Sequence, residues 1–246
     1  MEQTLRDRFI ELWRRYFNHA ELPLAFEYVD DSRSEQPESP VVGHRCVIGQ
    51  LIKARNGRTL CLTPESIACR GVGRYLSFRD GMFPGFAEFI AHNAAGEGEH
   101  YRRTPEMVSA WMDSLAVLPI RGRKLIVKRW DKLEEEDQPD GVIFFAEPDV
   151  LSGLFTLAGF DDDRPDAIVA PFGAGCTSIF YMAYREQIEG TGRAIIGMFD
   201  PTARKCVKSN LLTFSLPCDK FVRMVNHMEQ SFLATHSWEI IQRRIK

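Results

Sequence analysis

Several patterns that identify common protein classes are missing from this sequence. No stretch approaches the roughly 20 consecutive apolar residues that cross a bilayer, and candidates such as 142–146 and 179–184 are much shorter. Charged residues interrupt the apolar ones throughout residues 1–17, whereas a signal peptide needs a continuous apolar core. We therefore expect no membrane association and a cytoplasmic location.

An excess of basic charge is also missing. The chain of 246 residues has 31 lysines and arginines against 34 aspartates and glutamates, for a formal net charge of −3. Proteins that bind nucleic acid usually carry a basic excess that neutralises phosphates. The near balance indicates no general attraction to DNA, RNA or an anionic surface, so the expected partner is a small molecule or a metal.

The short motifs of well-known metal and catalytic sites are absent. The six cysteines contain no C-x-x-C pair, and the six histidines form neither H-x-x-x-H nor H-E-x-x-H. No P-loop lysine or G-x-S-x-G is present either. A chain of this length without an export signal is a poor setting for a disulfide framework. We expect the cysteines to be free thiols, ligands or core residues.

What is present is a succession of helix and strand patterns. Apolar residues at helical spacing predict a first helix over 4–20, and short apolar runs bounded by turn residues predict strands. The elements lack a clean βαβ rhythm. We expect an α+β (mixed α/β) fold, a mixed sheet with helices packed on it. It forms a single domain over 1–246 that could divide into two subdomains near residue 120. The other expected helices are 44–54, 65–69, 86–93, 107–118, 148–157, 175–185, 219–232 and 237–243, and the strands 24–29, 59–62, 123–130, 141–146, 167–170, 193–199 and 211–216.

The stretch VAPFGAGCTSIF, residues 169–180, is the most suggestive for chemistry. An apolar strand leads into a turn containing Gly173 and Gly175, and Cys176, Thr177 and Ser178 then open a helix. Small residues let backbone N–H groups approach a ligand, and a helix start leaves such groups unpaired. The same position lowers the pKa of a thiol. Cys176 is therefore a candidate nucleophile, and the turn is a candidate anion site.

A purely structural interpretation remains open for this stretch. In it, the glycines make an ordinary loop, Thr177 or Ser178 caps the helix and Cys176 fills space in the core. A further candidate follows the strand at 193–199, where Arg204 could pair with a carboxylate or phosphate of a ligand. Its alternative is a helix-opening turn with solvated charges.

Three cysteines in the first third of the chain have wide spacing. Cys46, Cys61 and Cys69 are separated by 15 and then 8 residues, whereas zinc and cluster sites usually contain closer pairs. Free cysteine is also among the most buried residue types. Spacing alone favours core cysteines over metal ligands.

The layout resembles the ArCR-type domain of unknown function found in bacteria and archaea. The similarity runs in order from about Cys46 to Pro217 and consists of short elements. It implies no established activity, but it implies that Cys46, Cys69 and Cys176 belong to one pattern and approach one another. The elements are Cys46 with Ala54 and Gly57, Cys69 with Gly71 and Gly73, Glu147-Pro148-Asp149, Gly175-Cys176, and Ala203-Arg204 leading to Leu216-Pro217.

Three hypotheses about function follow. In the first, Cys46, Cys69 and Cys176 form a metal or redox site, because thiolates suit zinc, copper(I) or an iron–sulfur cluster. In the second, the chain is a small-molecule or anion-binding protein or a thiol-dependent enzyme that uses the glycine-rich turn, Cys176 and Arg204. In the third, it is a structural or interaction module with every cysteine in the core.

Overall fold

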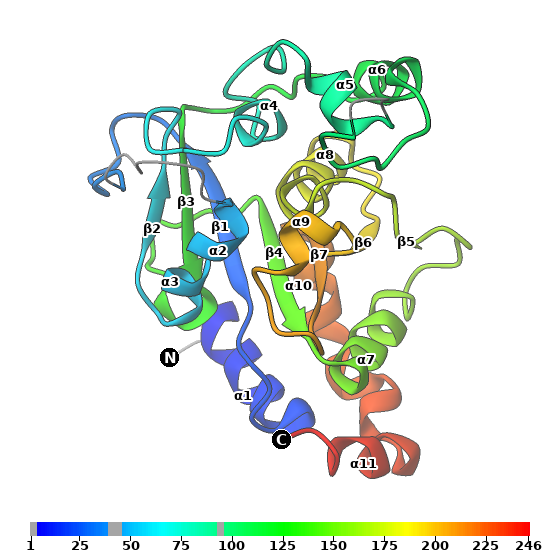
Figure 1. Ribbon diagram of the computed structural model, residues 1–246. Coiled ribbons are helices and arrows are strands. Elements are labelled where there is room, and N and C mark those ends of the chain that lie inside the picture. Colours follow the sequence, from blue (N-terminus) through cyan, green and yellow to red (C-terminus); the bar gives the residue numbers. More distant parts are fainter. Residues whose placement is uncertain (1–3, 39–45, 93–95) are drawn as a thin grey trace.

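One mixed sheet organises the protein. The computed structural model describes residues 4–38, 46–92 and 96–246 (Figure 1). Within these residues seven strands join in the order β2-β3-β1-β4-β7-β6-β5. Only β5 and β6 pair in parallel, and the expected α+β class is confirmed. The strands are β1 Leu24–Val29, β2 Leu60–Leu62, β3 Lys124–Arg129, β4 Gly141–Ala146, β5 Ile168–Val169, β6 Ala194–Gly197 and β7 Leu212–Pro217.

Helices cover both faces of this sheet. They include α1 Leu5–Phe17, α2 Val47–Gln50, α3 Ile52–Arg55, α4 Val72–Tyr75, α5 Phe86–Ile90, α6 Pro105–Asp113, α7 Pro148–Ala158, α8 Met182–Glu189, α9 Pro201–Arg204, α10 Cys218–His227 and α11 His236–Gln242. A π-helical turn over Thr177–Tyr181 precedes α8. Three 3-10 turns occupy Trp130–Lys132, Met228–Gln230 and Phe232–Ala234.

The central strands separate two hydrophobic cores. On β4, Ile143 and Phe145 pack into one core, and Val142, Phe144 and Ala146 into the other. This follows from the period of two along a strand, which sends successive side chains to opposite faces. The first core is shared with α2, α3, α4 and α8, and the second with α1, α7, α10 and α11.

The first helix forms as its sequence pattern predicts. Phe9, Trp13 and Phe17 are buried on one side of α1, and the rings of Trp13 and Phe17 stack with centroids 4.2 Å apart. Thr4 caps the helix by accepting a hydrogen bond from the Asp7 backbone N–H at 3.2 Å. Amphipathic spacing therefore determined both the helix and the face that it buries.

The helix expected over 65–69 does not form. The Ser66 hydroxyl accepts a hydrogen bond from the Thr63 N–H at 2.8 Å and donates to the Thr63 carbonyl at 3.1 Å. These bonds close a single turn, because a side chain takes the place of the next backbone group. Residues 67–69 continue without regular structure and bring Cys69 to the start of α4.

The segment around α5 and α6 has a small core of its own. Phe86, Ala91 and Val108 form it, and in Figure 1 the two helices lie at the top of the molecule, away from the strands. The predicted helix over 107–118 begins earlier and ends at Asp113. The rest of that range returns toward the sheet, where Leu115 and Leu118 join the core of α2, α4 and α8.

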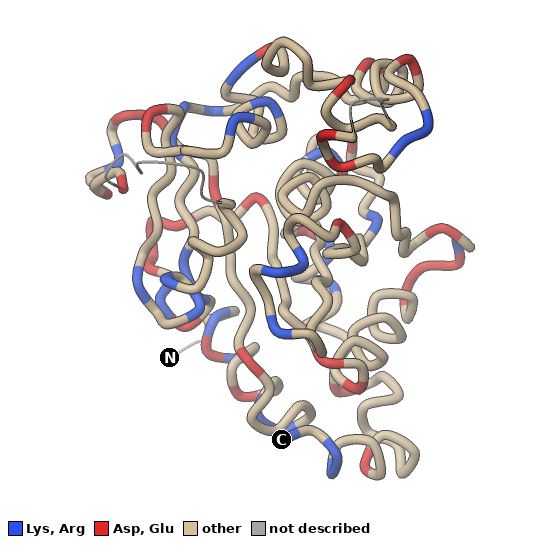
Figure 2. The backbone as a smooth tube through the Cα atoms, viewed as in Figure 1, with Lys and Arg blue, Asp and Glu red and all other residues tan. Residues whose placement is uncertain are grey.

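In the described part of the chain, no helix combines the length and apolarity needed to span a membrane. Lysine and arginine are interspersed with aspartate and glutamate over the described backbone, as Figure 2 shows.

A glycine inside α7 provides a test of packing against helix propensity. A Cβ at Gly153 would overlap the Trp238 ring and lie 2.8 Å from Phe17 Cε1, whereas a Cβ at Gly159 would meet nothing closer than 3.8 Å. Alanine is favoured over glycine in a helix by about 1 kcal/mol, but overpacking a core costs ~1–3 kcal/mol. We expect Gly153→Ala to lower the free energy of unfolding by roughly 1 kcal/mol, measured by urea titration. Gly159→Ala, at the end of the same helix, is the control and should leave it unchanged or raised. An increase for Gly153→Ala would contradict the packing.

Candidate functional site

A large cavity opens on the face of the sheet that carries α2, α4 and α8. Its volume is about 1280 Å³, above the ~300–1,000 Å³ usual for ligand pockets. Its walls come from α2 and α3, the segment 69–75, the α5–α6 segment, the loop 172–176 and the region around α9. Segments far apart in the sequence therefore converge on one hollow.

Four cysteines line this cavity. They are Cys46 at the start of α2, Cys69 before α4, Cys176 ahead of the π-helical turn and Cys206 just after α9. All are free thiols. The family resemblance grouped the first three, and these line one cavity in the structure. Cys206 was not among the expected residues, because a lone cysteine after a turn carries no spacing signal.

Burial raises the pKa of two of these thiols, Cys46 and Cys176. It raises the pKa of Cys46 to about 12, helped by the nearby sulfurs of Cys206 and Cys69. It also raises the pKa of Cys176 well above the ordinary thiol value, with Cys69 and Cys46 adding to the effect. We expected the helix start to lower the pKa of Cys176. The loss of solvent is the larger influence, because a thiolate at this site has left water.

The glycine-rich loop is pressed against α9. A Cβ at Gly175 would lie 2.5 Å from Ala203 Cβ, and the Gly175 N–H donates to the Asp200 carboxylate at 3.2 Å. The same carboxylate accepts hydrogen bonds from the backbone N–H and the hydroxyl of Thr202. Gly175 thus lines the cavity because only a glycine fits there. Gly173 is buried and is not among the described residues of the wall.

Thr177 and Ser178 face the interior of the fold and do not line the cavity. Their backbone N–H groups both donate to the Ala174 carbonyl, at 2.9 and 3.2 Å. The Ser178 hydroxyl donates to the Gly175 carbonyl at 2.8 Å, and the Thr177 hydroxyl is buried without a partner in the described structure. The N–H groups that the sequence offered to a ligand are therefore engaged within the helix.

Arg204 also lies outside the described wall of the cavity. Its guanidinium donates to the carbonyls of Lys208, Ser209 and Leu211. In this position it closes the loop between α9 and β7. The neighbouring Lys205 and Cys206 line the cavity instead, so a pairing of Arg204 with a ligand stays a prediction that this placement does not favour.

Aromatic side chains form much of the remaining wall. Sequence reasoning did not select them, although the run FRDGMFPGFAEF over 78–89 contains four of the chain's 17 phenylalanines. Arg70 stacks on Phe83 at 4.0 Å and Arg102 on Phe172 at 4.7 Å, measured from the guanidinium carbon to the ring centroid. The seven aromatic residues are Tyr75, Phe83, Phe86, Phe89, Tyr101, Trp111 and Phe172.

The described residues contain no group of three or more His, Cys, Asp or Glu side chains placed to hold a metal ion. The two remaining cysteines lie elsewhere. Cys61 packs on β2 with Val29 and Ile126, and Cys218 begins α10, where burial raises its pKa to about 12. The expected metal set Cys46, Cys69 and Cys176 therefore shares a cavity without forming a recognisable site for a single ion.

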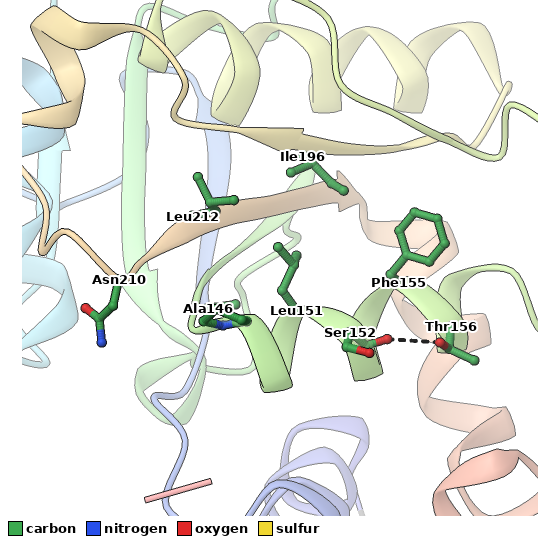
Figure 3. Close-up of a pocket in the computed structure, with 9 residues that line it drawn as sticks. Ala146, Leu151, Ser152, Phe155, Thr156, Ile196, Asn210 and Leu212 are labelled. Atoms are coloured by element: carbon green, nitrogen blue, oxygen red, sulfur yellow. Dashed lines mark hydrogen bonds between the residues drawn. The ribbon is translucent and has the colours of Figure 1, made fainter. Parts of the chain in front are cut away.

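A second hollow of about 350 Å³ lies between α7 and strands β6 and β7 (Figure 3). Its wall is mainly apolar, with Leu151, Phe155, Ile196 and Leu212 among its residues. None of the described residues lining it is titratable. It offers no group for acid, base or metal chemistry.

Comparison with protein families identifies the group to which the chain is related. Residues 14–227 match the profile of the family described as uncharacterised ArCR, DUF169. The chain belongs to this ArCR family. No curated protein shows a significant match, and no solved structure does so.

Much of the ArCR resemblance maps onto the cavity. The sequence elements of the resemblance are scattered between Cys46 and Pro217, yet six of their residues line the cavity. Gly175 packs against Ala203 in this wall, which explains why both positions hold small residues. The six residues are Cys46, Cys69, Gly71, Gly175, Cys176 and Ala203.

The raised thiol pKa values predict slow alkylation. For the folded protein at about pH 8, we expect iodoacetamide to modify Cys46 and Cys176 at least ~100-fold more slowly than in urea-unfolded protein. Each rate should still rise about ten-fold per pH unit up to about pH 9. Peptide mass spectrometry measures both rates. Reaction as fast as in the unfolded chain, or a plateau near neutral pH, would show an activated thiolate instead.

Proposed function

We propose that this protein binds a small molecule with an apolar, ring-containing body in the large cavity that residues of α2, α4 and α9 help to line. The observation that carries the proposal is the cavity itself, about 1280 Å³ in volume and lined by seven aromatic residues and four thiols. Large concave sites with aromatic walls and a few polar groups are typical of ligand binding.

The apolar wall is unusually exposed for a protein interior. Ile52, Phe89 and Phe172 line the cavity, with 50%, 44% and 38% of their surfaces accessible to solvent. Covering apolar surface is favourable by about 25 cal/mol per Å². A ligand that fills the cavity would therefore gain binding energy from side chains that the fold leaves uncovered.

Binding is better supported than thiol catalysis. A nucleophilic cysteine needs a lowered pKa or an adjacent base, and burial acts in the opposite direction on Cys46 and Cys176. The described wall contains no histidine to act as that base. The thiols then serve as polarisable, weakly polar contacts for the ligand.

A neutral fluorescent probe tests the aromatic wall. We expect N-phenylnaphthylamine to bind saturably to the folded protein, and Phe89→Ala to weaken that binding by about ten-fold, or ~1.4 kcal/mol. Fluorescence titration gives both affinities. Phe155→Ala is the matched control, because Phe155 is similarly exposed, at 48%, and lies in the smaller hollow. No saturable binding, or equal losses in the two variants, would rule out the cavity as the site.

A second candidate function uses the four thiols as ligands of an iron–sulfur cluster. It is favoured by the shared position of Cys46, Cys69, Cys176 and Cys206 in one cavity. Thiolates suit such clusters, and metal binding displaces the protons of thiol ligands. The described residues show no single-ion arrangement, so a cluster, whose ligands lie farther apart, is the version that we consider.

Anaerobic reconstitution with ferrous iron and sulfide tests this candidate. If the cluster forms, we expect visible absorption and bound iron, both lost in Cys46→Ser but kept in Cys61→Ser. Cys61 is the control because it lies on β2, outside the cavity wall. Colourless, iron-free protein after reconstitution would remove the cluster and leave the proposal of small-molecule binding untouched.

A further inference from the structure

Two arginines on the wall of the cavity have no acidic partner within residues 4–38, 46–92 and 96–246. Arg70 and Arg102 both line it, and among the described residues neither makes an ion pair with a carboxylate. Each instead lies over an aromatic ring, Arg70 on Phe83 at 4.0 Å and Arg102 on Phe172 at 4.7 Å. Their charges are held at the wall by stacking alone.

Stacking keeps a guanidinium ready to bind an anion. The flat face of the group rests on the ring, so the N–H donors along its edge stay free. That edge matches a carboxylate or a phosphate, to which it can donate two parallel hydrogen bonds. The rings also restrict the side chains, which lowers the entropy lost on binding.

The acidic side chains of the described wall already have ion-pair or hydrogen-bond partners. Glu38 pairs with Lys53, Glu99 accepts a hydrogen bond from the Tyr101 hydroxyl at 3.0 Å, and Asp200 accepts from Gly175 and Thr202. In the described structure none of them pairs with Arg70 or Arg102, and the partners of Glu99 and Asp200 are uncharged groups. The unpaired positive charge in the cavity is therefore local, in a chain whose formal net charge is −3.

The two arginines are linked through one short segment. The ring of Phe83, under Arg70, lies 6.4 Å from that of Phe89, and the backbone N–H of Arg102 donates to the carbonyl of Ile90, the residue after Phe89. Arg70 and Arg102 therefore line the same cavity as the rings of the α5 segment.

We propose that Arg70 and Arg102 recognise an anionic group on the cavity's ligand, so that the ligand class is an aromatic or otherwise apolar carboxylate or phosphate. This inference rests on the proposed binding function and specifies its ligand. The apolar body lies on the aromatic wall, and the anion accepts hydrogen bonds from the stacked guanidinium groups. The thiols of Cys46 and Cys176, whose pKa burial raises, line the same cavity and present no negative charge to that anion.

A matched pair of probes separates this inference from the binding function itself. Anilinonaphthalene sulfonate has the ring system of N-phenylnaphthylamine with one added anionic group. We expect the sulfonate to bind at least about ten-fold more tightly than the neutral probe. Its affinity should fall with added salt, whereas that of the neutral probe should not, because only the charged probe is screened.

Arginine variants test which positive charge contacts the anionic group of the probe. We expect Arg70→Gln and Arg102→Gln each to lower the ratio of sulfonate affinity to neutral-probe affinity by about ten-fold, because each variant removes a charge that attracts only the sulfonate. Arg70→Lys should restore part of the loss, because it keeps the charge without the planar edge. The control is Arg14→Gln, an exposed arginine on α1, which should change neither affinity.

Competition with naphthoate and with naphthyl phosphate then identifies the preferred anion. Displacement of the sulfonate by either competitor supports the inference, and the stronger competitor shows whether the site prefers a carboxylate or a phosphate. Equal affinities for the two probes, an unchanged affinity ratio in both glutamine variants, or no displacement by either competitor would overturn it. If the neutral probe also fails to bind, the binding function fails with it, and circular dichroism of each variant confirms that the fold is retained.

Discussion

The cavity depends on the close approach of the glycine-rich loop to α9. Gly175 and Ala203 meet at a distance that leaves no room for a side chain, and the Asp200 carboxylate holds the contact by bonding the Gly175 N–H at 3.2 Å. Because Cys176 follows directly and Cys206 ends the same turn, this contact decides where two of the four thiols lie. A larger residue at position 175 would push the loop away from α9 and open the inner wall.

The sheet supplies the rigid support behind that contact. Alternating side chains on β4 and its neighbours pack into two cores on opposite faces of the sheet, and helices cover both faces. The cavity lies over the face that carries α2, α4 and α8. The opposite wall belongs to the α5–α6 segment, which has its own small core. The cavity therefore lies between the packed face of the sheet and a smaller unit, and aromatic side chains such as Phe89 and Phe172 stay exposed there.

Within the cavity, solvent exclusion and stacking determine the chemistry. Burial outweighs the helix start and keeps Cys176 protonated, so the thiols act as contacts or, once deprotonated by a metal, as ligands. The arginines escape neutralisation because the nearby carboxylates bond to other groups. The cavity therefore combines the Cys46 and Cys176 thiols, whose pKa burial raises, with positive, ring-supported arginines. This combination favours the proposed ligand, an apolar molecule with an anionic group.

The sequence by itself determined most of the elements, whereas the grouping of three cysteines came from the family resemblance and not from their spacing. Amphipathic spacing predicted α1, and apolar runs predicted β1 and β4 at their observed bounds, because these signals are local. The prediction of a helix over 65–69 was wrong, because hydrogen bonds between Thr63 and Ser66 close a single turn there. The fourth thiol, the aromatic wall and the unpaired arginines were decided by tertiary structure alone. Burial, stacking and charge pairing depend on neighbours distant in the chain, and no local pattern records them.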